Sequence, residues 1–384
     1  MDSERRTSSR LPIGRAGGAS IAFAFGLFLV VFFAGLAVGG DVGDIMLAGV
    51  EPLPFTILAV LAYLGVDRGW ARVATVMWLF LLVFGVTLAA LALSNDAITS
   101  GGQTGSPASP IALGAVAAGS LVALLLGMAG FVRGFRVALS RILPIDPNSF
   151  VHAVALVAVA SLTLVSLVPL LVLGEPPLLA SLAGPEGGLP EEAGANAGLL
   201  RQDLYGLAWM IPAVVFAVGF GIRRELREAL VRLGLVRPTG GQIMAGLALG
   251  VVTLVASQLL SIGVESLWME MGWPLTDEAA LSKLIAYTLS PVGAVVMGVT
   301  AGLGEELAVR GVLQPRLGLV MSNLFFTALH ALQYNWDALV SVFLLGLLFG
   351  VVRQRANTST SAIVHGFYDF LVTMAVILEI PWFQ

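Results

Sequence analysis

VATVMWLFLLVFGVTLAALALS, residues 73–94, has no ionisable side chain and is long enough to cross a bilayer, which takes about 20 residues. Similar apolar runs recur along the chain, near 19–39, 45–66, 110–132, 150–173, 204–222, 242–264, 284–312, 317–333, 338–352 and 358–379. Of the 384 residues, 58% are hydrophobic and only 11% are charged, more apolar surface than a soluble protein of this length can bury. The sequence therefore predicts an all-α, polytopic transmembrane bundle of about 11 helices.

Basic side chains divide the segments between these runs into two groups. Cytoplasmic loops carry the excess of arginine and lysine, and with the N-terminus inside most of the 20 basic residues fall in inner segments. These inner residues are Arg5, Arg6, Arg10, Arg15, Arg68, Arg72, Arg133, Arg136, Arg141, Arg223, Arg224, Arg227, Arg232, Arg237, Arg316, Arg353 and Arg355. The outer segments hold only Arg201 and Lys283. We expect a cytoplasmic N-terminus.

A basic, amphipathic segment, RRELREALVRLGLVR at 223–237, separates two groups of predicted spans and is suited to the membrane surface. The predicted organisation is a cytoplasmic arm (1–18), an N-terminal transmembrane bundle of unknown role (19–222), a cytoplasmic amphipathic linker (223–240) and a C-terminal transmembrane domain (241–384).

The composition narrows the chemistry. The chain has no cysteine, which excludes disulfides, thiolate catalysis and cysteine-based metal sites. Lys283 is the only lysine, a bias typical of a GC-rich bacterial genome, so we expect a multi-pass protein of the bacterial plasma membrane. Its surroundings are membrane lipid, and we expect no nucleic-acid partner.

Ionisable residues inside a span are costly and by default suggest function. They concentrate in three segments of the C-terminal domain: GEELAVRG (304–311), FFTALH (325–330) and HGFYD (365–369). Glu306 and Arg310 are four residues apart, so they share a helix face and can pair. Phe326 and His330 have the same spacing, as do His365 and Asp369, so each histidine has a companion that can orient it.

The depth of each ionisable residue along its helix predicts that the three segments meet. If Ser290 caps a helix that begins at Pro291, Glu305 lies roughly 17 Å from the inner end at Arg316. His330 lies roughly 18 Å along the next helix, and His365 roughly 14 Å along the last. A carboxylate and two imidazoles at one level can form a hydrolytic site in a wet pocket reached from the cytosolic side. The same three residues could bind a divalent metal such as zinc.

The order EExxxR, FxxxH and HxxxN/D, each on its own span, resembles the CPBP family of intramembrane proteases, which includes the CAAX prenyl endopeptidases similar to Rce1 and the bacterial Abi proteins. The resemblance covers roughly 284–375. It implies that Glu305 activates water and His330 assists it, while His365 and Asp369 stabilise the oxyanion. Glu306, Arg310 and Phe326 match supporting positions. The implied activity is an intramembrane endopeptidase that cleaves a membrane-associated or prenylated-like protein or peptide and requires no cofactor.

Two departures from the family pattern bear on mechanism. Val309 stands where the family often has an aromatic residue. Asp369 replaces the commoner asparagine, and an ionised aspartate cannot donate a hydrogen bond to an oxyanion. It therefore acts protonated, orients His365 or ligates a metal, and a metalloprotease mechanism stays open. A proton- or ion-coupled transporter and a catalytically silent scaffold or immunity protein are the alternative functions.

Overall fold

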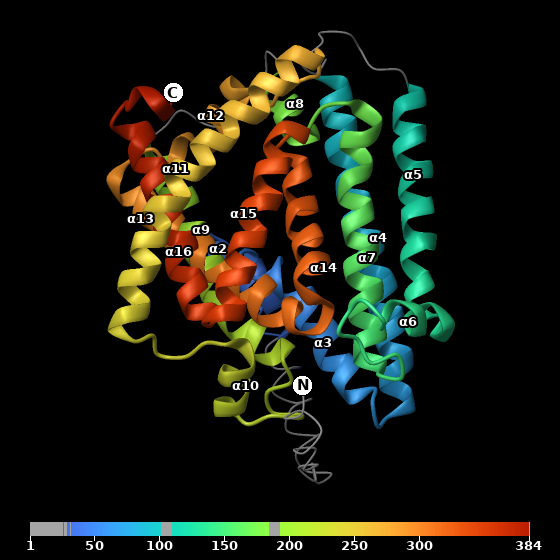
Figure 1. Cartoon of the computed structure of the whole chain (residues 1–384). Coiled ribbons are helices and arrows are strands. Elements are labelled where there is room, and N and C mark those ends of the chain that lie inside the picture. The colour runs from blue at the N-terminus through green and yellow to red at the C-terminus, as the bar shows by residue number, and fades with distance from the viewer. Residues whose placement is uncertain (1–25, 27–28, 31, 101–109, 184–192, 384) are drawn as a thin grey trace.

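A computed structural model describes residues 26, 29–30, 32–100, 110–183 and 193–383, and its architecture is all-α (Figure 1). In the N-terminal part the helices are α2 (Gly40–Leu47), α3 (Pro52–Leu64), α4 (Gly69–Thr99), α5 (Pro110–Met128), α6 (Arg133–Leu139), α7 (Phe150–Leu173), α8 (Pro177–Ala183) and α9 (Ala193–Ala217). The C-terminal part holds α10 (Leu226–Leu233), α11 (Gly240–Met271), α12 (Glu278–Ile285), α13 (Pro291–Thr300), a π-helix (Ala301–Leu313), α14 (Gln314–Leu329), α15 (Trp336–Arg355) and α16 (Thr358–Ile377).

Seven helical stretches of the described residues are long and apolar enough to cross a membrane, and an eighth is added if the bent pair α2 and α3 counts as one span. The seven are Gly69–Thr99, Ile111–Phe131, Phe150–Leu173, Gly240–Met271, Pro291–Leu332, Trp336–Arg355 and Thr358–Ile377. The chain is therefore an integral, multi-pass membrane protein.

The described residues hold seven candidate spans, or eight with the bent pair, where the sequence predicted about 11, and three runs account for the difference. Ten of the 21 residues of the 19–39 run lie outside the described residues, so this predicted span is not tested. The 204–222 run falls in α9, which is not among the candidate spans and whose first half carries Arg201 and Asp203. The runs at 284–312 and 317–333 belong to one continuous helical stretch, Pro291–Leu332, but it is kinked at Gly318, where φ is 80°, and folds back so that Arg310 lies 3.3 Å from Asn323. Only glycine adopts this left-handed conformation readily, and it allows the kink near the start of α14.

The helix ends form two groups (Figure 1). The short helices α6 and α10, which belong to arginine-rich segments, lie at the bottom of the view, and α8 and α12 lie at the top. This separation is what the predicted alternation of loops requires, but the side that faces the cytoplasm stays a prediction. The proposed division at 223–240 also stays a prediction; Val214 and Val218 before this segment, and Leu233 within it, pack against Leu307 of the π-helix.

Local signals start the helices of the C-terminal domain where the sequence predicted. The hydroxyl of Ser290 accepts a hydrogen bond from the amide of Gly293 at 3.0 Å, and Pro291 is the first residue of α13. Helix α16 begins after Asn357, whose side chain accepts from the amide of Thr360 at 2.8 Å. These caps fix the register of the helices that carry the ionisable residues.

Glycines allow α16 to lie directly against α13 and the π-helix. A Cβ added to Gly302 would lie 2.6 Å from the Cα of Gly366, and one added to Gly298 would lie 2.5 Å from the carbonyl oxygen of Gly366. Real Cβ atoms do not come this close to backbone atoms. Small residues at facing positions give such close packing in membranes, where apolar side chains gain nothing by leaving lipid.

Candidate active site

The first ionisable segment lies in a π-helix, Ala301–Leu313, and not in the α-helix that its spacing predicted. π-helices occur mostly as single-turn bulges, often at functional sites, so a stretch of 13 residues is unusual. The wider turn keeps Glu306 and Arg310 in contact: Nε of Arg310 lies 3.5 Å from Oε1 of Glu306. Glu305 and Glu306 point in different directions. The side chain of Glu305 is 38% exposed, while that of Glu306 is 1% exposed.

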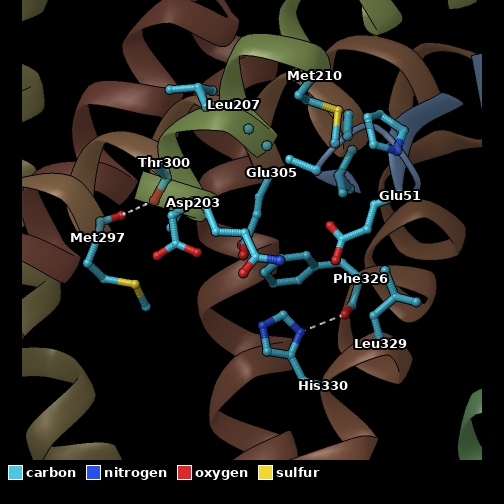
Figure 2. Close-up of a pocket in the computed structure, with 18 of the residues that line it drawn as sticks. Glu51, Asp203, Leu207, Met210, Met297, Thr300, Glu305, Phe326, Leu329 and His330 are labelled. Atoms are coloured by element: carbon cyan, nitrogen blue, oxygen red, sulfur yellow. Dashed lines mark hydrogen bonds between the residues drawn. The ribbon is translucent and has the colours of Figure 1, made fainter. Parts of the chain in front are cut away.

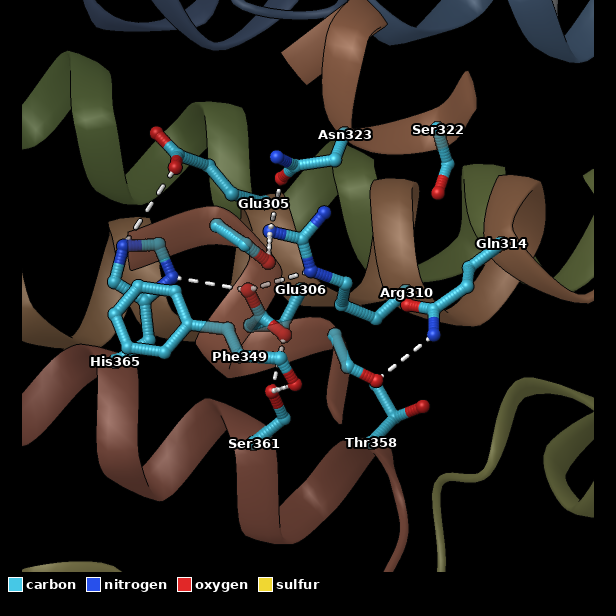
Figure 3. A network of polar contacts seen from close by, with 12 residues as sticks. Glu305, Glu306, Arg310, Gln314, Ser322, Asn323, Phe349, Thr358, Ser361 and His365 are labelled. Carbon is cyan, nitrogen blue, oxygen red and sulfur yellow. Dashed lines mark hydrogen bonds and ion pairs between the residues drawn. The ribbon is translucent and has the colours of Figure 1, made fainter. Parts of the chain in front are cut away.

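Glu306 is the centre of a buried polar network (Figure 3). Its Oε1 lies 3.1 Å from Nδ1 of His365, and its Oε2 lies 2.5 Å from the hydroxyl of Ser361. Both partners belong to α16, so the carboxylate joins the π-helix to the last span. A buried charge is tolerated when it is paired and hydrogen-bonded, and Glu306 has both kinds of partner.

Arg310 extends this network to α14 and α15. Its NH2 group donates to the carbonyl oxygen of Gly346 at 2.9 Å and to Oδ1 of Asn323 at 3.3 Å. The guanidinium also lies over the ring of Phe326, 5.0 Å from its centre, in a cation–π contact. The predicted pairing of Glu306 with Arg310 therefore forms, and it holds four helical segments in one arrangement.

His365 lies between carboxylates. Its Nδ1 faces Glu306, while its Nε2 lies 3.3 Å from Oδ2 of Asp369 and 3.8 Å from Oε2 of Glu305. The ring is buried and stacks on Phe349, 4.3 Å between centres. An imidazole with carboxylates at both nitrogens satisfies them best as an imidazolium, since both of its nitrogens then donate. This geometry matches one of the expected roles of Asp369, the orientation of His365.

His330 ends α14 and is oriented by its backbone and by two rings. Nδ1 lies 2.9 Å from the carbonyl oxygen of Phe326 and donates to it, and Nε2 points away from this bond. The ring meets Phe326 edge-on at 4.7 Å and stacks on Tyr334 at 5.9 Å. Phe326 also contacts the ring of His365, at 6.3 Å, and so lies between the two histidines.

Glu305 and His330 line the same cavity, which has a volume of about 560 Å³ (Figure 2). Its walls come from the α2–α3 bend, α9, α13, the π-helix and α14, and include Glu51, Asp203, Tyr287 and Phe326. His365 and Asp369 are not among the lining residues. The three expected residues therefore come together, but His365 contacts Glu305 from behind and does not face the cavity.

Three polar residues of the cavity lie toward those ends of their elements that are away from the arginine-rich segments. Glu51 precedes α3, whose far end leads to Arg68, and Asp203 lies in the first half of α9, whose far end leads to Arg223. Tyr287 precedes α13. The side of the membrane from which this pocket is reached stays a prediction.

The comparisons with known proteins agree with the motif order. Residues 287–371 match the family model described as type II CAAX prenyl endopeptidase Rce1-like. The chain carries an Rce1-like domain. No curated protein and no solved structure matches the chain. The Rce1-like domain spans all three motifs, from before Glu305 to just after Asp369, and confirms the resemblance found in the sequence.

A metal site does not fit the side chains of the Rce1-like domain as they stand. In the described part of the chain, no three His, Asp or Glu residues are grouped so that they could hold a metal ion. His365 has no free ring nitrogen for a metal, because Glu306 and Asp369 occupy both of its nitrogens. Metal binding by Glu305, His330 and His365 stays an untested prediction, and no catalytic step is assigned to it.

Several residues that shape this site have no motif to reveal them. Ser361 bonds Glu306, and Asn323 accepts from Arg310, yet both read as ordinary polar residues of a span. Tyr334 stacks on His330. Burial, with the nearby charges of Asp369 and Glu305, raises the pKa of Tyr334 to about 12, so its hydroxyl keeps its proton. The position of Tyr334 four residues after His330 is the one sequence feature that could have predicted this contact.

Proposed function

We propose that this protein is an intramembrane endopeptidase in which Glu305 activates a water molecule with the help of His330. The observation that carries the proposal is the shared cavity: a half-exposed carboxylate and an imidazole with a free Nε2 face one space large enough for a peptide segment. General acid–base catalysis needs groups within reach of one water molecule, and the lining of one cavity by both residues supports this arrangement.

The proposed step is a hydrolysis. Water lies between the Glu305 carboxylate, which accepts one of its protons, and Nε2 of His330, which accepts a hydrogen bond from the other. The water oxygen forms a bond to the peptide carbonyl carbon, and the C–N bond then breaks. The proton held by Glu305 passes to the leaving nitrogen, so the products are a carboxylic acid and an amine.

In this proposal His365 is a positioning residue. Its ring lies behind Glu305, between Glu306 and Asp369, and keeps a positive charge 3.8 Å from the catalytic carboxylate. That contact fixes the orientation of the Glu305 side chain, which lines the cavity. The direct oxyanion role that the family pattern implies for His365 and Asp369 requires them to move, because they donate to and accept from each other. The substrate is a membrane-associated protein or peptide, as the protease family implies.

The test is cleavage of candidate peptides by the purified full-length protein in lipid nanodiscs. Glu305→Gln keeps the shape and hydrogen-bonding capacity of the side chain but cannot take the proton. Glu270→Gln is the matched control, because Glu270 is exposed near the end of α11 and lies outside the cavity. The proposal expects cleavage to be lost in the first variant and kept in the second; equal activity in both rejects Glu305 as the base.

A further inference from the structure

The walls of the cavity carry an uneven distribution of charge. Three carboxylates line it, those of Glu51, Asp203 and Glu305, together with His330. Of the described residues that line this space, none is an arginine or a lysine. A cavity with low-dielectric walls and one sign of charge selects ligands of the opposite sign.

Glu51 and Asp203 come from elements outside the Rce1-like domain. Glu51 lies at the bend between α2 and α3, directly before Pro52, and its side chain makes no capping hydrogen bond. Asp203 projects from α9, and its Oδ2 accepts from the hydroxyl of Tyr287 at 3.1 Å. In Figure 2 the two carboxylates lie on either side of Glu305 and point toward the same space. The N-terminal helices therefore contribute chemistry to the site as well as walls.

Unlike Glu306, Glu51 and Asp203 have no ion-pair partner among the described residues. The ion pairs of the described residues join Glu306 to Arg310 and His365, but none involves Glu51 or Asp203. Burial and the charge of Glu51 raise the pKa of Asp203, while the hydrogen bond from Tyr287 lowers it. Like charges around one cavity repel each other unless a cation enters, and the described lining residues supply no arginine or lysine there.

We propose that the cavity selects a peptide segment with a cationic group, a lysine or arginine side chain or a free α-amino group, next to the bond that is cleaved. Glu51 and Asp203 receive this cation and leave Glu305 free to act on water. The same charges exclude a carboxylate at that place, including a free C-terminal carboxylate close to the scissile bond. This inference rests on the proposed function and names its substrate class.

The experiment uses one peptide that the wild-type protein cleaves, or the best-bound peptide of a library if none is cleaved. The residues on either side of the scissile bond are changed in turn to lysine, glutamine or glutamate, with acetylated N-terminus and amidated C-terminus. A separate arm uses a neutral peptide with a free N-terminus near the bond. This arm distinguishes an α-amino group from a side chain as the source of the cation.

Two readouts are taken on the full-length protein: kcat/KM for cleavage and Kd from fluorescence anisotropy. We expect the lysine peptide to exceed the glutamate peptide by about tenfold or more in both, and the difference to shrink in high salt. In the double variant Glu51→Gln with Asp203→Asn the preference falls to within about twofold. The amide oxygen introduced by Asp203→Asn can still accept from Tyr287, and Glu51→Gln disturbs no cap, so both changes remove charge and little else. Glu270→Gln keeps the full preference.

The outcomes separate the two proposals. If no peptide is cleaved, or Glu305→Gln cleaves like the wild type, the proposed protease fails, while anisotropy still measures the charge preference. If lysine and glutamate peptides bind and react equally, the charge inference is overturned and the protease stands. A lysine preference that survives the double substitution also overturns it, because the cation then binds away from Glu51 and Asp203.

Discussion

The Nδ1 atom of His365 lies 3.1 Å from Oε1 of Glu306, although 59 residues separate the two in the chain. This contact ties α16 to the π-helix, and Arg310 continues the connection to Asn323 of α14 and Gly346 of α15. The two glutamates of the first motif therefore have different positions. Glu306 holds the helices together inside the protein, while its neighbour Glu305 faces the cavity.

Removal of one partner from the buried pair leaves an uncompensated charge. Arg310 and Glu306 are both fully buried. We expect Arg310→Met to lower the free energy of unfolding by about 3–5 kcal/mol, seen as a lower apparent Tm in detergent. The double variant with Glu306→Gln should recover part of this loss. An Arg310→Met protein as stable as the wild type contradicts the account of the network.

The close approach of α16 to α13 depends on glycine. A Cβ added to Gly366 would lie 2.3 Å from the carbonyl oxygen of Gly298, so Gly366→Ala must push the helices apart. We expect a cost of about 1–3 kcal/mol and a loss of activity, since His365 is the adjacent residue. Gly263→Ala in α11 is the control, because its added Cβ meets nothing within 4 Å. Equal Tm values for the two variants contradict the prediction.

Asp369 is expected to act through His365 and not as a direct donor. Asp369→Asn keeps an oxygen that can accept from Nε2 of His365, so we expect kcat to stay within about threefold of wild type. Asp369→Leu removes the acceptor and should reduce kcat by about 10–100-fold with little change in KM. If the asparagine variant is as inactive as the leucine variant, the charge of Asp369 itself is required.

We expect the Asp203 carboxylate to lower the free energy of unfolding at neutral pH. Burial first, and then the charge of Glu51, raises the pKa of this carboxyl, despite the hydrogen bond from Tyr287. The folded state thus holds the proton more tightly than the unfolded state, and stability falls as the pH rises through the interval between the ordinary and the raised pKa. Asp203→Asn removes this titration, so its apparent Tm should exceed that of the wild type by about 1–2 °C at pH 8.

That difference should shrink as the pH falls toward about 4, where Asp203 is increasingly protonated in both states. Thermal unfolding curves of the two proteins across this range measure it. The other titratable groups that face the cavity, Glu51, Glu305, His330 and Tyr287, are present in both proteins and cancel in the comparison. A difference that grows toward acid pH has the wrong sign and contradicts the prediction.

The sequence predicted those features that depend on local signals. Hydropathy located most of the spans, and Ser290 and Pro291 marked the start of α13 correctly. Equal depth on three helices predicted a common pocket for Glu305, His330 and His365; the structure places Glu305 and His330 on one cavity and His365 behind Glu305. Their catalytic roles stay predictions, because geometry alone does not measure a reaction.

Other features depend on contacts between distant segments, and no local pattern carries them. The spacing of Glu306 and Arg310 suits an α-helix as well as a π-helix, so the wider turn was missed. Glu51 and Asp203 belong to no sequence motif, yet both line the cavity because α3 and α9 pack beside the Rce1-like domain. Which faces of these helices meet is decided by side-chain packing in three dimensions.

The most direct test of the central claim is peptide hydrolysis in H₂¹⁸O, read by mass spectrometry of the new C-terminus. Wild-type protein in nanodiscs and the Glu270→Gln control should release a product with one ¹⁸O atom, because water supplies the oxygen. Glu305→Gln should do so at least about 100-fold more slowly, the usual scale for the loss of a general base. Labelled product at the wild-type rate from Glu305→Gln contradicts the account.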